Sequence, residues 1–388
     1  MLFHKPSWIS MPASAAESYK FHSTDGRYLM KAWQLDGLGG SFRYTDLPVP
    51  RARPGSVVVR IEASSLMSYM QDYVEGKLPI YQAPRRPFVP GGNGAGIIHE
   101  VGEGVWHLEP GQRVVISSHL VAQENVRNPA QILVGVTGQG PIAANMQDDW
   151  ADGTLADFAI VPASLVTPVD DLGEISAAML AVSMRYLVPY GGLLRGRLTA
   201  GETVVVSGAT GAYGSAAIFV ALAMGAGRVV ALGRDQAKLA ALKAISGARV
   251  TTVPVTGDAT KDAAQIRELT GGGANLGFDM VGGAADPNMT LAALRSLLDG
   301  GRLVLMGSMN VPLPIPYTEV MLHSWEIIGN FMYPRDAYRR LMDLVRAGLL
   351  KLDAIEPHIY RLAELRNAML AARSAGSLEC IVMDHTGD

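Results

Sequence analysis

Two different patterns of hydrophobic residues divide the chain near residue 200. Between residues 31 and 166, short runs of β-branched residues, as at 56–61 and 113–116, are bounded by Pro-Gly turns. Such runs predict β-strands joined by tight turns. From Gly201 onward, apolar strand-like segments alternate with alanine-rich segments of helical character. This alternation predicts a parallel sheet with helices on both faces.

In the second half of the chain the pattern predicts individual elements. We expect strands at 203–207, 228–232, 277–281 and 302–306, and helices at 215–224, 236–245 and 290–298. The tail from residue 327 predicts a strand, a helix over 336–346 and a final strand near 380–383. The longest apolar run, 216–224, is too short to span a bilayer.

Length and composition narrow the class of protein. With 388 residues, of which 48% are hydrophobic, the chain is long enough for two domains. A net charge of −3 without a basic stripe predicts neither a nucleic-acid nor a membrane partner. The single cysteine, Cys380, excludes an internal disulfide and every multi-cysteine metal site. It is compatible with the reducing cytoplasm, where we expect the protein to work.

The first 29 residues are polar and aromatic. His4, Lys5, Pro6 and Ser7 interrupt the apolar run that a signal peptide needs. We therefore predict a flexible N-terminal extension over 1–29, with a misplaced start ahead of Met30 as the alternative.

A strand–turn–helix segment at 204–214 carries a glycine motif. Gly208, Gly211 and Gly214 follow a strand and open a helix within a β–α–β unit. Backbone N–H groups at such a helix N-terminus bind a dinucleotide pyrophosphate, and glycines keep side chains out of its way. The alternative is a glycine-rich turn without a ligand. The predicted cofactor contacts in this loop are Ser207, Gly208, Thr210, Gly211, Ala212, Tyr213 and Gly214.

The end of the second strand favours NADP over NAD. NAD sites usually place an acidic residue there to bind the ribose 2′-hydroxyl, but this strand ends in Gly233 followed by Arg234. Arg234 and Lys238 are suited to a 2′-phosphate through charge-assisted hydrogen bonds. The alternatives are a ribose contact from Asp235, and plain surface charge at Arg234 and Lys238.

Several motifs occur in the order typical of one protein family. They are the glycine loop and the segments 88–96, 101–105, 110–114 and 153–158. With them, residues 30 to 383 resemble the medium-chain dehydrogenase/reductase superfamily, especially its zinc-free quinone oxidoreductase branch. The resemblance implies an α/β fold with a doubly wound Rossmann sheet and a β-rich, GroES-like substrate domain. The expected divisions are GroES-like at 30–171, nucleotide-binding at 172–326, and 327–388 completing the substrate domain.

The resemblance also locates a lost metal site. Zinc-dependent relatives hold catalytic zinc with a cysteine, a His-Glu pair and a further cysteine or aspartate. The matching positions here are Met67, Gly92 with Asn93, and Ala181, none of which has a zinc-binding side chain. The segment 117–150, which would hold structural zinc, lacks cysteine, and His99, His107 and His119 have no metal-ligand spacing. We therefore predict no metal.

Without a metal, hydrogen-bond donors must stabilise the charge that hydride transfer creates on a carbonyl oxygen. The resemblance places Tyr69 where zinc alcohol dehydrogenases carry the Ser or Thr of their proton relay. We predict Tyr69, Asp72 and Asn93 as catalytic residues; the alternatives are an aromatic wedge at Tyr69 and a surface carboxylate at Asp72. The expected pocket residues are Met67, Ser68, Trp150 and Tyr333, with plain packing as the alternative for the last two.

The family positions the nicotinamide at strand ends of the nucleotide domain. The matching positions are Val281, Gly282, Met306, Gly307, Ser308, Asn330 and Phe331, for which plain strand-to-loop turns are the alternative. The family also usually dimerises through edge strands, which predicts a homodimer through 304–311 and 322–329.

These features predict an NADPH-dependent, metal-free reductase of a small enone or quinone, because conjugated substrates delocalise the negative charge themselves. One alternative is a zinc-independent alcohol dehydrogenase, or a ketone or imine reductase, that uses Tyr69 as its proton donor. Another, of a different class, is a non-catalytic NADPH-binding sensor or structural protein.

Overall fold

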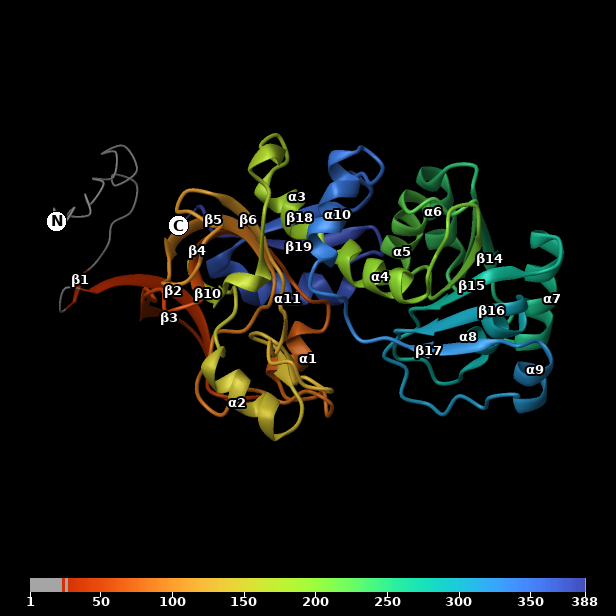
Figure 1. The fold of residues 1–388 in the computed structure, drawn as a ribbon, viewed down its shortest axis with the longest axis horizontal. Helices are drawn as coiled ribbons and strands as arrows, with labels where there is room; N and C mark the ends of the chain where they lie inside the picture. Colours follow the sequence, from red (N-terminus) through yellow and green to blue (C-terminus); the bar gives the residue numbers. More distant parts are fainter. Residues whose placement is uncertain (1–22, 25–26, 388) are drawn as a thin grey trace.

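The computed structural model describes residues 23–24 and 27–387, so most of the predicted extension over 1–29 lies outside the described residues. The chain forms two domains that lie side by side (Figure 1). One is rich in antiparallel strands, and the other is a parallel sheet covered by helices. They are named the substrate domain and the nucleotide domain, respectively, after the roles predicted from the sequence. The α/β class predicted from the sequence is confirmed.

The nucleotide domain is a six-stranded parallel sheet with the order β14-β13-β12-β15-β16-β17. The central strand β12 begins the domain, the chain moves outward to β14, and it then returns to β15 on the other side of β12. The strand order therefore reverses beside β12, which is where open α/β sheets bind their ligands. The strands are β12 (Thr203–Ser207), β13 (Arg228–Gly233), β14 (Val250–Pro254), β15 (Ala274–Asp279), β16 (Leu297–Leu305) and β17 (Glu326–Gly329).

The sequence pattern predicted most of this domain. The strand at 203–207 and the start of the helix at 236 match the structure, whereas β14 and the helix Ala259–Thr270 were missed. The predicted helix over 290–298 ends at Arg295, and residues 297–305 are strand instead. The helices are α5 (Ala212–Ala223), α6 (Gln236–Ser246), α7 (Ala259–Thr270), α8 (Asn288–Arg295) and α9 (Tyr317–Leu322).

The substrate domain is built on a sheet with the path β11-β6-β5-β4-β19-β18, and β10 also pairs with β4. The C-terminal strand β19 pairs antiparallel with β4, so the end of the chain returns to the sheet formed by its first half. Its strands are β4 (Ser56–Ser65), β5 (Gly94–Val101), β6 (Arg113–Ile116), β10 (Phe158–Pro162), β11 (Val166–Pro168), β18 (Glu356–Arg361) and β19 (Glu379–Asp384).

Two small antiparallel sheets and several helices complete this domain. The strands are β1 (Ser23–Thr24), β2 (Arg27–Leu35) and β3 (Phe42–Pro48), then β7 (His119–Val121), β8 (Gln131–Leu133) and β9 (Thr137–Gly138). The helices are α1 (Met70–Val74), α2 (Pro141–Asp149), α10 (Ala337–Arg346) and α11 (Leu365–Ser374). The expected domain boundaries at 30 and 326 fall inside β2 and β17.

Helices α3 (Ala177–Val182) and α4 (Met184–Arg195) lie between the two domains (Figure 1). Helix α3 contacts β4, β5 and β19 of the substrate domain, whereas α4 packs on α5 of the nucleotide domain. The combined segment Ala177–Arg195 is apolar and long enough to cross a membrane, but 78% of it is buried inside the protein. These two helices therefore form part of the core that joins the domains.

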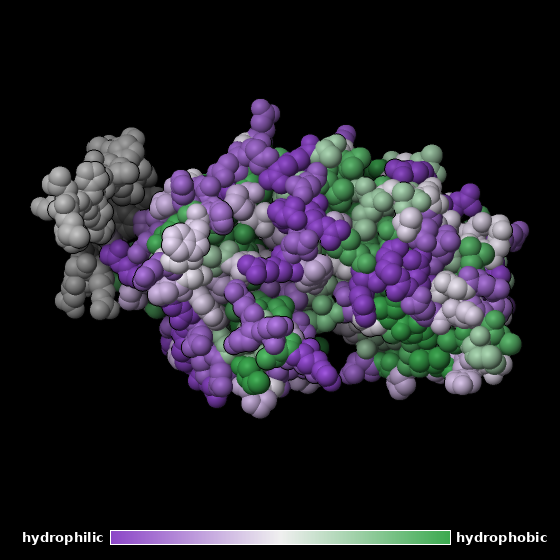
Figure 2. All heavy atoms as spheres, in the orientation of Figure 1, coloured by the Kyte–Doolittle hydropathy of each residue, from purple (hydrophilic) through white to green (hydrophobic). Residues whose placement is uncertain are grey.

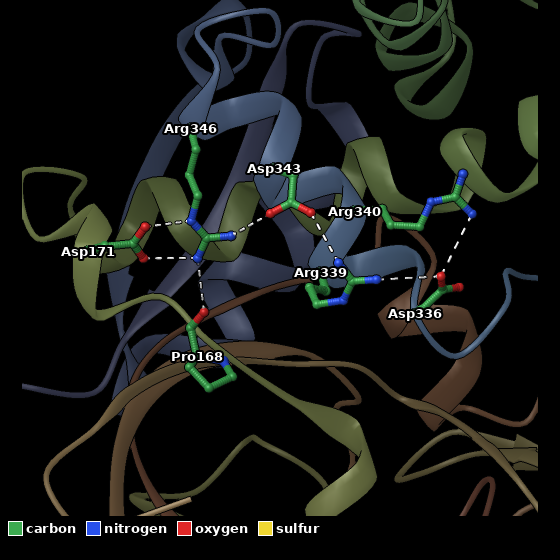
Figure 3. A network of polar contacts seen from close by, with 7 residues as sticks. All are labelled: Pro168, Asp171, Asp336, Arg339, Arg340, Asp343 and Arg346. Atoms are coloured by element: carbon green, nitrogen blue, oxygen red, sulfur yellow. Dashed lines mark hydrogen bonds and ion pairs between the residues drawn. The ribbon is translucent and has the colours of Figure 1, made fainter. Parts of the chain in front are cut away.

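A chain of ion pairs ties α10 to the end of β11 (Figure 3). The Arg346 guanidinium donates to both oxygens of Asp171, at 2.6 and 2.9 Å, and also to Asp343 and to the Pro168 carbonyl oxygen. The hydrogen bonds from Arg346 lower the pKa of Asp171. Asp343, Arg339, Asp336 and Arg340 extend the network along α10.

Candidate active site

The glycine loop follows the central strand at the point where the strand order reverses. Gly208 has a φ of +72°, and a Cβ there would lie 3.0 Å from the Met280 carbonyl oxygen. Helix α5 begins directly after Gly211, its N-cap. A Cβ on Gly214 would lie 2.1 Å from the Gly208 carbonyl oxygen, so only glycine lets the helix pack on this turn. Gly211 is exposed, which leaves the helix N-terminus open to a ligand.

The end of β13 lies beside this loop. A Cβ on the buried Gly233 would lie 2.6 Å from the Thr210 side chain. Arg234 and Lys238 are both exposed. The Asp235 carboxylate accepts a hydrogen bond of 3.0 Å from the Lys238 backbone N–H and caps α6. Asp235 therefore has a local structural role, and two cations remain at this edge.

The ends of β15 and β16 approach each other closely. A Cβ on Gly307 would lie 2.1 Å from the Val281 carbonyl oxygen, and one on Gly282 would lie 2.9 Å from the Ser308 hydroxyl. The Asn330 amide donates to the Met332 carbonyl oxygen at 2.8 Å and contacts the Met306 sulfur at 3.4 Å. Phe331 is 56% exposed. Most of the residues predicted at the nicotinamide end therefore lie at adjacent strand ends.

Tyr69 lies at the junction of the two domains. Its ring is 5.8 Å from that of Tyr81, and its pKa is raised by removal from water, then by the nearby Tyr213 and Tyr81. Arg185 acts in the opposite direction, lowering the pKa of Tyr69. The structure thus brings the predicted catalytic Tyr69 near Tyr213 of the glycine loop. The Tyr69 hydroxyl stays protonated at neutral pH and forms a hydrogen bond with Tyr81, which a ligand would have to replace in order to accept from Tyr69.

Tyr333 contributes a second hydroxyl to this junction. It is 5% exposed, and its hydroxyl lies 3.0 Å from the Ser117 hydroxyl. Burial raises the pKa of Tyr333, and Tyr213 raises it further. The His119 Nδ1 atom lies 3.0 Å from the Tyr333 carbonyl oxygen, and Nε2 lies 2.8 Å from the Gln131 side-chain amide; burial lowers the pKa of His119. A neutral ring has one N–H, and when this is at Nδ1 it donates to the Tyr333 carbonyl oxygen and supports Tyr333.

Asn93 is held in one orientation. Its side-chain oxygen accepts a 2.6 Å hydrogen bond from the Ser65 hydroxyl and a longer one from the Ser65 backbone N–H. The main-chain carbonyl oxygen of Asn93 accepts a hydrogen bond of 2.8 Å from the Thr154 hydroxyl. With the amide oxygen occupied, the NH2 group of Asn93 is the part available to a ligand.

The remaining residues predicted for catalysis or for the substrate pocket differ in burial and in their contacts. Asp72 is half-buried in the first turn of α1, where its charge suits the helix dipole. Met67 packs against the substrate-domain core, and Ser68 is exposed. The Trp150 ring is covered by the Arg53 guanidinium, 3.7 Å from its centroid, and packs with the small core of segment 120–165.

The positions that match zinc ligands do not fit a metal. A Cβ on Gly92 would lie 2.6 Å from the Ser118 Cβ, so no side chain has room there. Ala181 is 1% exposed within the hydrophobic core, and Met67 has only a thioether. Among the described residues, no group of three or more His, Cys, Asp and Glu side chains could hold a metal ion.

Sequence reasoning missed two buried charged groups. Arg185 is 6% exposed in α4, and its guanidinium carbon lies 5.7 Å from the Tyr213 ring centroid. Asp279 is 2% exposed at the end of β15, where burial raises its pKa to about 7. The only signal for Arg185 was a lone cation within an otherwise apolar helical run, and Asp279 resembled an ordinary strand end.

Comparisons with known proteins agree with this architecture. Residues 53–171 match the alcohol dehydrogenase GroES-like domain, and residues 212–347 match the zinc-binding dehydrogenase family. An alcohol dehydrogenase of Moraxella sp. (strain TAE123) is 27% identical over 359 residues, which cover 92% of this chain and 100% of that protein.

Solved structures show the same fold. The 2R,3R-butanediol dehydrogenase of Bacillus subtilis superimposes with a TM-score of 0.74 at 21% identity, covering 92% of this chain and 99% of the other. A dehydrogenase from Sinorhizobium meliloti 1021, solved bound to NADP, gives a TM-score of 0.72 at 19% identity over 92% of this chain and 100% of the other.

Proposed function

We infer that this chain, which belongs to the medium-chain dehydrogenase/reductase family, is an NADPH-dependent, metal-free reductase of small enones or quinones. The main support for the proposal is the arrangement of residues at the junction of the two domains. The glycine loop, with Tyr213, lies near Tyr69, while the positions that match zinc ligands have neither ligand chemistry nor room.

The choice of NADPH rests on the edge beside the glycine loop. Arg234 and Lys238 are exposed there, and none of the ion pairs among the described residues engages either of them. The nearby carboxylate, Asp235, already caps α6. A 2′-phosphate would pair with these two cations, neither of which has an ion-pair partner among the described residues. The NADP found in the Sinorhizobium structure supports a nicotinamide cofactor for the fold.

The residues at the junction suit conjugate reduction. NADPH supplies a hydride when bound. Tyr69, kept protonated, can donate a hydrogen bond or a proton to the substrate, and the Asn93 amide is oriented by Ser65 to donate a second hydrogen bond. Tyr333 and the aromatic rings around Tyr69 limit access of water to the reacting atoms.

An alcohol dehydrogenase is the second candidate, because the Moraxella relative carries that name. Product analysis with an enone that contains both C=C and C=O bonds separates the two. We expect a saturated ketone; an allylic alcohol would support the alternative. Binding is measured first, by titrating NADPH and NADH against protein fluorescence. Tight binding without turnover of any enone, quinone, ketone or imine would support a non-catalytic protein.

The protein is further proposed to be a homodimer through β17. The predicted interface began at residue 304, but Val304 lies in β16, which is paired on both sides. On this side of the sheet the edge strand is β17, the other edge being β14, and Figure 2 shows hydrophobic residues gathered over β17. Nearby, Ile315, Tyr317, Met321 and Leu322 are 52–80% exposed. Light scattering should give twice the chain mass of 41.3 kDa, and a monomer mass would contradict the proposal.

A further inference from the structure

Arg185 is a buried cation at the domain junction. It is 6% exposed, and its Nη1 atom has no hydrogen-bond partner among the described residues. None of the ion pairs in that part of the chain involves Arg185, although twenty pairs engage other cations there. An ionised group out of water without a counter-charge costs several kcal/mol, so its retention calls for an explanation.

The neighbours of Arg185 do not neutralise it. The guanidinium lies over the Tyr213 ring at 5.7 Å and contacts the Cys380 thiol of β19. Burial raises the pKa of this thiol, and Tyr213 and Tyr69 also have raised pKa values, so all three groups are uncharged at neutral pH. Within the part of the chain that the structure describes, no neighbour therefore balances the positive charge of Arg185.

The position of Arg185 links it to the reaction. It influences Tyr69 of the substrate domain and Tyr213 of the glycine loop, so it lies between the two halves of the proposed site. It also follows Ala181, the position that matches a zinc ligand, by four residues. Its effect on Tyr69, which follows Met67 by two residues, also brings this positive charge close to the segment that carries another of the positions matching zinc ligands.

The structure assigns Arg185 the role of the metal: its guanidinium stabilises the substrate oxygen on which negative charge develops during hydride transfer. This assignment rests on the proposed function. In enone reduction the hydride of NADPH adds to the β-carbon, the C=C electron pair moves toward the carbonyl, and the oxygen becomes an enolate. Arg185 donates hydrogen bonds to that oxygen, and a proton from the Tyr69 hydroxyl, which water then reprotonates, adds to the α-carbon to give the saturated ketone and NADP⁺.

The first experiment compares wild type with Arg185→Met, Arg185→Lys and a control, Arg340→Met. Arg340 also lies over a tyrosine of α4, Tyr190 at 5.9 Å, but it pairs with Asp336. We expect Arg185→Met to lower kcat about 10²- to 10³-fold, with KM for NADPH changed less than about threefold. Arg185→Lys should retain part of the rate, and the control should be near wild type. The midpoint of thermal unfolding should not fall in Arg185→Met, because an unpaired buried charge is removed.

The second experiment needs no turnover. 4-Nitrophenol, whose phenolate resembles an enolate oxygen, is titrated in the complex with NADP⁺ and followed by its absorption. Arg185 should lower the pKa of the bound phenol by about 1–3 units relative to Arg185→Met. If the wild type reduces no enone but shows this shift, the proposed enone reduction fails, whereas the binding of a negatively charged oxygen by Arg185 is supported. The assignment would be overturned if the bound 4-nitrophenol ionised equally in both proteins, or if the wild type did not bind it. In the first experiment, a higher substrate KM with unchanged kcat in Arg185→Met would also overturn it.

Discussion

Asp279 gives the nucleotide domain a pH-dependent stability that can be calculated from its surroundings. The carboxyl is 2% exposed, and Thr290 donates a 3.0 Å hydrogen bond to it. Burial raises its pKa from 3.8 to about 7, because the described structure gives it no cationic partner to favour ionisation. Asp279→Asn retains the acceptor for Thr290 and removes the titration.

The sign of the change in stability with pH follows from which state, folded or unfolded, binds the Asp279 proton. Between pH 4 and 7 the folded protein holds the Asp279 proton and the unfolded chain does not, so this group stabilises the fold at low pH. That contribution disappears as the pH rises through the folded pKa of about 7. With these two pKa values, the wild type should lose about 2–3 kcal/mol relative to Asp279→Asn between pH 5 and pH 8.

The assay is urea unfolding of both proteins at half-unit pH steps, monitored by tryptophan fluorescence and circular dichroism. The difference in unfolding free energy between the two proteins is plotted against pH. Taking this difference removes the contributions of the other titrating groups, which both proteins share. Curves that run parallel from pH 5 to pH 8 would show that Asp279 stays ionised in the fold, and the burial argument would be wrong.

Three other changes test separate parts of the molecule. Tyr69→Phe should lower kcat about 10²-fold or more if its hydroxyl delivers a proton, with little change in NADPH binding; an unchanged rate would leave Tyr69 as an aromatic wedge. Arg234→Ser combined with Lys238→Ser should weaken NADPH binding about tenfold or more and leave NADH binding nearly unchanged; equal loss for both cofactors would contradict the 2′-phosphate role. Arg346→Ala should reduce unfolding free energy by about 0.5–1 kcal/mol at low salt and less at 1 M salt, because its partner Asp171 is half exposed; a loss independent of salt would point to packing instead.

The glycine motif could be located from the sequence because its requirements are local. Gly208 must adopt a positive φ, and Gly214 must leave room for the preceding turn, so both positions are determined within one strand–turn–helix unit. The bounds of β12 and β6 were predicted for the same reason. The edge strand of the sheet was not predicted from the sequence. Its identity depends on the pairing between β16 and β17, and an apolar run does not reveal which strand it pairs with.

Asp235 shows how a local role competes with a functional one. From the sequence it was an alternative ribose ligand, but its position immediately before a helix makes it an N-cap. The residue spacing for capping was visible in the sequence, yet it does not distinguish the two roles. The hydrogen bond from the Lys238 backbone N–H to the Asp235 carboxylate shows the capping role, and the ribose contact stays a prediction.

The unusual environment of Arg185 could not have been recognised from the sequence, because it consists in the absence of a carboxylate near the guanidinium among the described residues. An arginine in an apolar helix usually finds a carboxylate, and the helix alone does not say whether one is near. The fold places α4 between the domains and surrounds the guanidinium with groups that stay neutral, Tyr213 and Cys380. On the other side of the junction, the close contact at Gly92 leaves no room for a metal ligand. Hydride transfer to a substrate carbonyl, as we propose for this protein, would create on the substrate oxygen the negative charge that Arg185 lacks among the described residues.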